Sequence, residues 1–228
     1  MRGKLILIEG TDCSGKQTQS ELLVKRLIED GRKVQTISFP MYDTPTGKII
    51  GGPYLGKPAI GESWFSEGAT NVDSKVASLY YAADRLYNVS KIKDLLDAGV
   101  DVVLDRYAPS NMAHQGGKIK DESERYKLYK WIDDLEYDFL KLPKPDYSFL
   151  LYMPHKYAQE LRKARSEKLD AHESSEEHLK NAELAYLELA VLYDFEIINC
   201  VKEKRILSIE EISDNLYNEV VSALGKIK

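Results

Sequence analysis

Glycine, serine and lysine occur near the start of the chain at the spacing of a phosphate-binding loop. The segment Gly10-Thr11-Asp12-Cys13-Ser14-Gly15-Lys16 follows an apolar run at residues 5–8 and precedes a helical pattern from residue 18 to about residue 30. The backbone N–H groups of such a loop and of the helix after it bind phosphate oxygens, and its lysine adds a positive charge. We therefore expect residues 10–18 to bind the phosphates of a nucleoside triphosphate.

The residue after the lysine departs from the usual pattern of such loops. A serine or threonine normally follows the lysine and ligates Mg²⁺, whereas this chain has Gln17 and then Thr18. The Gln17 carboxamide oxygen, the Thr18 hydroxyl or a water molecule can take that place. We expect Mg²⁺ to be held mainly by nucleotide phosphates and water, because it prefers oxygen ligands and keeps much of its hydration shell.

A parallel sheet is the element that must hold this loop. Short runs rich in β-branched and aliphatic residues predict strands at residues 5–8, 34–39, 100–104, 147–153 and 196–199. The first two strands and the helix between them form a βαβ unit, which implies a parallel sheet covered by helices.

Helical patterns fall between the predicted strands. They cover residues 18–30, 74–98 with a break near Asn88, 126–139 and 209–224, and a polar helical region at 156–193 is interrupted at 169–175. Residues 43–72 carry several Gly and Pro residues and show no periodicity. Irregular stretches of this length inside compact domains are usually functional, so we expect a substrate-binding or lid role there.

Composition limits the class of protein and its partners. The chain has 228 residues, of which 43% are apolar, and this length suits one domain. Its 32 basic and 37 acidic residues give a formal charge of −5, so we expect no nucleic-acid polymer and no membrane surface as a partner. Two cysteines, no secretory leader and no apolar run near the ~20 residues of a membrane span favour the cytoplasm.

Five segments, taken in order, carry a family resemblance. They are residues 9–16, the Phe39-Pro40 pair, residues 79–85, residues 105–110 with 115–117, and residues 169–173 with 185–190. Each segment is a weak signal alone, but together they make the chain resemble the thymidylate kinase family of nucleoside monophosphate kinases. The resemblance implies one α/β domain over residues 1–228, built as three layers with a five-stranded parallel sheet wrapped by helices. It also implies a lid at about residues 156–175, a homodimer, and Mg²⁺-assisted transfer of the γ-phosphoryl group of ATP to dTMP, giving ADP and dTDP.

The resemblance further implies roles around the acceptor nucleotide. Tyr81 is expected to stack on thymine and Arg85 to donate to a base carbonyl, a pattern that opposes the amino group of cytosine. Asp105 and Arg106 are expected to organise the waters of the metal and to hold the acceptor phosphate. The complete dTMP site implied in this way is Phe39, Tyr42, Tyr81, Arg85, Asp105, Arg106, Ser110, His114 and Gln115.

The catalytic set implied by the resemblance includes arginines of the lid. Some family members carry a catalytic arginine inside the phosphate loop, where this chain has Cys13, and others carry it in the lid. The basic run before residue 169 makes Arg165 the first candidate and Arg162 the second, whereas without the neighbouring motif such a run is usually a solvated helix face. Lys16, Asp12 and Arg106 complete the expected catalytic set, and Glu173 joins Asp105 as an expected contact of the metal.

Two positions depart from the family pattern and leave the acceptor open. An arginine often follows the Phe-Pro pair and grips the acceptor phosphate, but this chain has Tyr42, which donates only one neutral hydrogen bond. Arg106 or Lys48 then has to take more of that role. His114 replaces an aromatic residue that crowds the 2′ position of the sugar. A kinase of another deoxynucleoside monophosphate therefore remains an alternative, followed by a nucleotide-dependent switch and a non-catalytic binding homologue.

Overall fold

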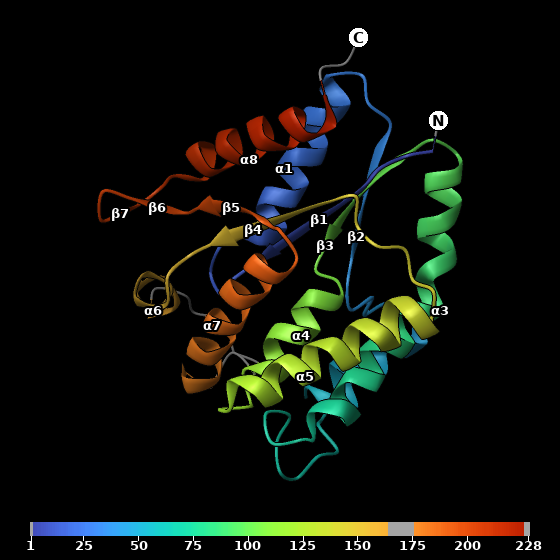
Figure 1. The fold of residues 1–228 in the computed structure, drawn as a ribbon, viewed down its shortest axis with the longest axis vertical. Coiled ribbons are helices and arrows are strands. Elements are labelled where there is room, and N and C mark those ends of the chain that lie inside the picture. Colours follow the sequence, from blue (N-terminus) through green and yellow to red (C-terminus); the bar gives the residue numbers. More distant parts are fainter. Residues whose placement is uncertain (1, 164–175, 226–228) are drawn as a thin grey trace.

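The computed structural model describes residues 2–163 and 176–225 and contains a five-stranded parallel sheet (Figure 1). The strands lie in the order β2-β3-β1-β4-β5 and all neighbours are parallel. Their bounds are β1 Leu5–Gly10, β2 Val34–Ser38, β3 Asp101–Asp105, β4 Tyr147–Tyr152 and β5 Glu196–Asn199. The sheet and its five predicted strands are thus confirmed.

Helices cover both faces of this sheet and make three layers (Figure 1). On one face lie α1 (Lys16–Glu29) and α8 (Ile209–Leu224). On the other lie α3 (Ser74–Asp97), α4 (Ala108–Gly116), α5 (Glu122–Asp133) and α7 (Glu176–Leu192). Shorter elements complete the fold: α2 (Pro45–Ile49), the π-helices η1 (Ile50–Tyr54) and η2 (Asp134–Phe139), α6 (His155–Lys163), and a hairpin of β6 (Val201–Lys202) and β7 (Arg205–Ile206).

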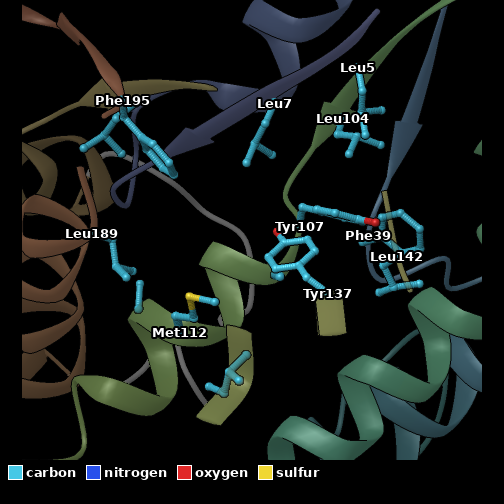
Figure 2. Close-up of a cluster of buried hydrophobic side chains, with 14 of the residues drawn as sticks. Leu5, Leu7, Phe39, Leu104, Tyr107, Met112, Tyr137, Leu142, Leu189 and Phe195 are labelled. Carbon is cyan, nitrogen blue, oxygen red and sulfur yellow. The ribbon is translucent and has the colours of Figure 1, made fainter. Parts of the chain in front are cut away.

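The central strand β1 supplies apolar side chains to both faces. Leu5 and Leu7 belong to the cluster under α3, α4, α5 and α7, part of which Figure 2 shows, whereas Ile6 and Ile8 belong to the cluster under α1 and α8. All four are fully buried. Successive residues of a strand point to opposite faces, so a continuous apolar run is what a sheet covered on both sides requires. Burying each of these side chains contributes about 1.5–3 kcal/mol, which anchors the strand that carries the phosphate loop.

The structure differs from the sequence-based expectation in several helices. Helix α3 runs unbroken past Asn88, whose buried amide donates to the Asp84 carbonyl oxygen at 2.9 Å and to its carboxylate at 3.1 Å. Helix α5 begins four residues earlier than expected, at Glu122, where the Asp121 side chain accepts from the Glu124 N–H. Helix α4 and the β6–β7 hairpin were not expected at all.

The irregular stretch at residues 43–72 packs as a small unit of its own. It contains α2 and η1, and its apolar side chains form a third buried cluster with the start of α3: Ile50, Tyr54, Leu55, Ala69, Val72 and Ala77. The Lys118 ammonium after α4 donates to the carbonyl oxygens of Ala69 at 3.1 Å and Val72 at 2.9 Å, which ties the end of this stretch down. Among the residues described, no helix is long and apolar enough to cross a membrane.

Candidate functional site

A cavity of about 730 Å³ opens where three neighbouring strands of the sheet end. The register pairs Ile8 of β1 and Ser38 of β2 with Asp105 of β3, so the loops after these strands leave the sheet side by side. Ligands of open parallel sheets bind at this edge, beyond the carboxyl ends of the strands. The cavity is lined by the phosphate loop at residues 10–18 together with residues from β2, α3, α4, and α7.

The phosphate loop has the backbone that its sequence requires. A Cβ on Gly10 would lie 2.4 Å from the Ser14 Oγ and 3.1 Å from the Leu151 carbonyl oxygen, so a larger residue there would require its neighbours to move. Gly15 has φ 72° just before α1 begins, which glycine adopts without a steric penalty, and Cys13 has φ 56°, which is uncommon for a residue with a side chain. The Thr11 hydroxyl donates to the Met153 carbonyl oxygen at 2.7 Å and accepts from its N–H at 2.8 Å, which fixes the loop to the end of β4.

Lys16 lies at the buried first turn of α1 and is 8% exposed. Burial and the nearby Arg106 guanidinium lower the pKa of Lys16 to about 8, against the opposing effect of Asp105, Glu9 and Asp12. Within residues 2–163 and 176–225, Lys16 forms no ion pair. An anionic ligand in the cavity would supply a counter-charge to this ammonium.

A buried carboxylate that the sequence analysis overlooked connects the loop to α4. Glu9 is fully buried near the end of β1, where it accepts hydrogen bonds from the N–H groups of Tyr107 at 2.9 Å and Ser110 at 3.0 Å. The hydroxyls of Ser110, at 2.6 Å, and Tyr186, at 3.3 Å, donate to its other oxygen. Burial raises the pKa of Glu9. The Glu9 side chain, which belongs to β1, thus caps the N-terminus of α4. The one sign of this role in the sequence is an acidic residue near the end of an otherwise apolar strand.

Arg106 stands between β3 and α4, the two elements that Glu9 holds together. It has φ 68°, and its guanidinium lines the cavity, with the Ser110 hydroxyl 3.5 Å away. Burial opposes its charge, but Tyr186, Asp105 and Glu9 outweigh burial and raise the pKa of Arg106. No ion pair of Arg106 is formed with a residue in the part of the chain that the structure describes. It is therefore available to an anion.

Asp105 offers the carboxylate that best fits a divalent cation. The Ser38 hydroxyl donates to its Oδ2 at 3.3 Å, whereas its Oδ1 is buried and has no hydrogen-bond partner among the described residues. Carboxylate oxygens suit Mg²⁺, which also keeps several waters. The described residues contain no cluster of three or more side chains that could bind a metal by themselves. The donor set thus fits an ion shared with phosphates and water.

The α3 side of the cavity carries aromatic rings and one arginine. Phe39 and Tyr107 have ring centroids 5.8 Å apart, and Tyr81 lines the same wall with its ring edge-on to Tyr54. Arg85 also lines the cavity, and its Nε and Nη2 donate to the two carboxylate oxygens of Glu136. Burial lowers the pKa of Arg85, but the Glu136 carboxylate outweighs burial, so the pKa of Arg85 is raised.

The segment with Tyr42 is held in place by a buried carboxylate of α3. Asp84 accepts from the Met41 N–H at 2.9 Å and from the Thr46 hydroxyl at 2.7 Å. Tyr42 lines the cavity, whereas Lys48 does not. Of the two expected cations, Arg106 and not Lys48 thus lies in the cavity wall with Tyr42.

Helix α4 presents some of its expected residues to the cavity and not others. Ser110 and His114 line it, and the His114 Nδ1 is 3.2 Å from the Nε2 of His178. The Gln115 side chain is fully buried outside the cavity wall, so the structure does not bring it to the expected base contact. Asn111, one helical turn earlier, lines the cavity, and both of its amide atoms are buried without a hydrogen-bond partner among the described residues. Asn111 was not among the expected site residues, because its place in the cavity wall depends on helix α4, which the sequence did not predict.

The lid region reaches the phosphate loop through α6. The Arg162 Nε lies 3.1 Å from the Asp12 Oδ2. Arg165 and Glu173, and the expected lid beyond residue 163, lie outside the described residues. The preference for Arg165 over Arg162 as the catalytic arginine therefore stays a prediction, as does the metal contact of Glu173.

Comparisons with known proteins point to one family. The family model described as thymidylate kinase matches residues 8–212. A thymidylate kinase from Plasmodium falciparum is 33% identical over 69% of this chain and 65% of its own length, and one from Homo sapiens is 34% identical over 67% and 62%. The aligned stretch thus spans slightly less than two thirds of these two relatives. A probable thymidylate kinase from Methanocaldococcus jannaschii is 33% identical over 97% of this chain and 96% of its own.

A solved structure gives the same result in three dimensions. The thymidylate kinase of Candida albicans superposes with a TM-score of 0.71 at 26% identity, covering 98% of this chain and 92% of that one. Broad substrate specificity is attributed to the Candida protein.

Proposed function

Because the chain belongs to the thymidylate kinase family, we propose that it is a dTMP kinase, which transfers the γ-phosphoryl group of ATP to dTMP and yields ADP and dTDP. One observation carries the proposal. A single cavity joins the phosphate loop to a second set of side chains, with aromatic rings and Arg85, that suits a nucleobase. A hydrolase or switch that uses water as the acceptor has no need of that second set.

The chain's own residues supply position and charge for the transfer. The loop N–H groups and Lys16 bind the donor phosphates, and Arg106 binds the phosphate of the acceptor, so that attacking and leaving oxygens can lie in line. Phosphoryl transfer needs this positioning and positive charge more than covalent help. Arg162, beside Asp12, is placed to bring a further cation to the transferring group.

Magnesium and the base complete the proposed complex. Asp105, with Gln17 and Thr18 nearby in the loop, would hold Mg²⁺ in part through water, and the ion would neutralise the donor phosphates. On the α3 side, Tyr81 stacks on the base and Arg85 donates to its carbonyl oxygen. An arginine only donates hydrogen bonds, so Arg85 suits the carbonyl oxygen of thymine and disfavours the amino group that cytosine has at the same place.

Kinetics with each acceptor test the proposal. Purified protein with ATP, Mg²⁺ and one of dTMP, dUMP, dCMP or dGMP is assayed for ADP and for the deoxynucleoside diphosphate. We expect dTMP to have the highest kcat/KM, and ADP release without acceptor to be at least about 100-fold slower. Faster turnover of dGMP or dCMP would identify another deoxynucleoside monophosphate kinase, the alternative that Tyr42 and His114 on the cavity wall favour. ADP release independent of any acceptor would indicate a switch.

The remaining assignments concern assembly and location. Residues 1–228 are proposed to form one domain with a lid at 156–175, in a cytoplasmic homodimer without nucleic-acid or membrane partners. Helix α3 supports a dimer, because Val76, Leu79 and Tyr87 on it are exposed. Light scattering after gel filtration should give twice the 26.0 kDa of one chain. Leu79→Glu should halve that mass, and a monomeric wild-type protein would contradict the dimer.

A further inference from the structure

Arg85 is the only arginine of the described cavity wall whose charge is matched within the protein by a fully buried carboxylate. The Glu136 carboxylate comes from η2 and does not itself line the cavity. It accepts from the Arg85 Nε at 2.7 Å and from its Nη2, and the two side chains are 3% and 0% exposed. The pair is bidentate, a geometry that fixes the plane of the guanidinium.

This pairing leaves one edge of Arg85 for a ligand. Glu136 takes the Nε hydrogen and one of the two Nη2 hydrogens, whereas Nη1 forms no hydrogen bond with any side chain or backbone group in the described part of the chain. The Tyr107 ring, whose centroid is 5.9 Å from the Arg85 Cζ, covers one side of the guanidinium. Arg85 therefore brings to the cavity wall one oriented donor edge, formed by Nη1 and the remaining hydrogen of Nη2.

The pairing also removes the net charge of that donor. Lys16 and Arg106 on the same cavity wall form no ion pair with described residues, so they can attract phosphate. An unpaired buried guanidinium at position 85 would attract phosphate as well, since Arg binds phosphate through the same two-pronged geometry. A neutral base offers only a carbonyl oxygen, for which an oriented and neutralised donor is sufficient.

The geometry points to Glu136 as a positioning residue that decides which end of the acceptor nucleotide enters the α3 side of the cavity. It turns the Arg85 Nη1 toward the base carbonyl and cancels the charge that would otherwise bind a phosphate there. The inference rests on the proposed dTMP kinase function. It concerns a side chain that touches no substrate and acts only through Arg85.

Steady-state kinetics of Glu136→Gln test this role. A glutamine keeps the size of the side chain but removes its charge and one acceptor. We expect KM for dTMP to rise about tenfold, while KM for ATP and kcat at saturation stay within about threefold. Inorganic phosphate, competing with dTMP, should inhibit the Glu136→Gln enzyme about tenfold more strongly than wild type.

A matched control breaks the same kind of pair elsewhere. Glu188 accepts from the Arg125 Nε at 2.8 Å and from its Nη2, and neither residue lines the cavity. Glu188→Gln should therefore change stability but leave both KM values and the inhibition by phosphate unchanged. If Glu136→Gln behaves in the same way as Glu188→Gln, or raises both KM values equally, Glu136 has only a structural role and the inference is overturned.

A second variant covers the case in which Glu136→Gln does not fold. Glu136→Asp keeps the charge but is too short to reach both Nε and Nη2, so we expect a KM for dTMP raised about fivefold and unchanged inhibition by phosphate. A wild-type KM for dTMP in Glu136→Asp would overturn the inference. A wild-type enzyme that prefers another deoxynucleoside monophosphate would refute the proposed acceptor alone, because the same comparison can then be made with that acceptor.

Discussion

The two sides of the cavity contain the same kinds of cation but make them available in different ways. On the phosphate-loop side, Lys16 is buried and Arg106 is half-buried, and neither has an ion-pair partner among the described residues. Burial and the nearby Arg106 guanidinium lower the pKa of Lys16 to about 8. On the α3 side, Arg85 is buried and is bound by Glu136. The first side is prepared for an anion, and the second for a neutral group with an acceptor oxygen.

This difference shows that the pairing of a cation, and not its presence, decides which ligand it can bind. Desolvating an unpaired charge is costly, so a buried cation without a partner gains much from a phosphate. The charge of a cation with a bidentate partner is already compensated, so such a cation mainly provides a hydrogen bond of fixed direction. The overall charge of −5 carries no information about either side.

Removal of Lys16, the unpaired cation of the phosphate-loop side, should have the largest effect on turnover. Lys16→Ala removes the unpaired cation of the loop, so kcat should fall by roughly 10³-fold or more while the fold persists. Steady-state kinetics and circular dichroism measure the two quantities. Lys118→Ala is the control, since Lys118 also has a pKa lowered by burial to about 8 but donates to backbone carbonyls outside the cavity. Turnover of Lys16→Ala within tenfold of wild type would contradict the role of the loop.

Removal of Arg162, the arginine of α6 beside the phosphate loop, should have the next largest effect on turnover. Arg162→Ala removes a cation that contacts Asp12, so we expect kcat to fall about 100-fold with KM for ATP changed less than threefold. Arg26→Ala serves as the control because Arg26 forms a comparable ion pair, with Asp214 at 2.8 Å, on the exposed surface. A pure rise in KM for ATP would assign Arg162 to binding instead.

Proton uptake should report the missing counter-charge of Lys16. The pKa of Lys16 near 8 means that this group is about half protonated at pH 8 in the free protein, and bound phosphates favour the charged form. ATP binding at pH 8 should therefore take up about 0.5 proton, and uptake by Lys16 should vanish near pH 6.5, where it is already charged. Calorimetry in buffers of different ionisation enthalpy measures this number. Lys118→Met should keep the uptake at pH 8, and its loss there would assign the proton to Lys118.

The smallest effect concerns the backbone of the phosphate loop. Gly15 has φ 72° with open space where a methyl group would lie, so Gly15→Ala should cost about 1 kcal/mol of unfolding free energy through backbone strain alone. Gly61 is the comparison, because its φ lies outside the left-handed range and its nearest neighbour is 3.7 Å from a Cβ. Urea unfolding should show Gly61→Ala unchanged or slightly stabilised. Equal destabilisation of both variants would mean that backbone strain is not the cause.

The sequence predicted the sheet and the loop well, because both depend on local patterns. Apolar runs such as residues 5–8 and the spacing of Gly10, Gly15 and Lys16 specify local conformation directly. The family resemblance placed Arg85, Arg106 and Ser110 at one site, and the structure brings all three to the same cavity.

The sequence could not predict contacts between distant segments. Glu9 caps α4 from 98 residues away, and Glu136 reaches Arg85 across 51 residues, so neither role has a local signal. Helix α4 was missed for a related reason, since its N-terminus is capped by Glu9 and not by its own residues. Gln115 was placed at the base because the expectation followed its motif, whereas the helix directs Asn111 to the cavity instead.

Thymidine and dTMP binding to two variants tests the division of the cavity most directly. Thymidine has no phosphate, so its affinity isolates the α3 side, and calorimetry measures both ligands. We predict that Arg106→Met weakens dTMP about tenfold or more while thymidine stays within twofold, and that Glu136→Gln weakens thymidine about tenfold. If Arg106→Met weakens thymidine as much as dTMP, or Glu136→Gln leaves thymidine binding unchanged, the two sides do not divide the ligand as described.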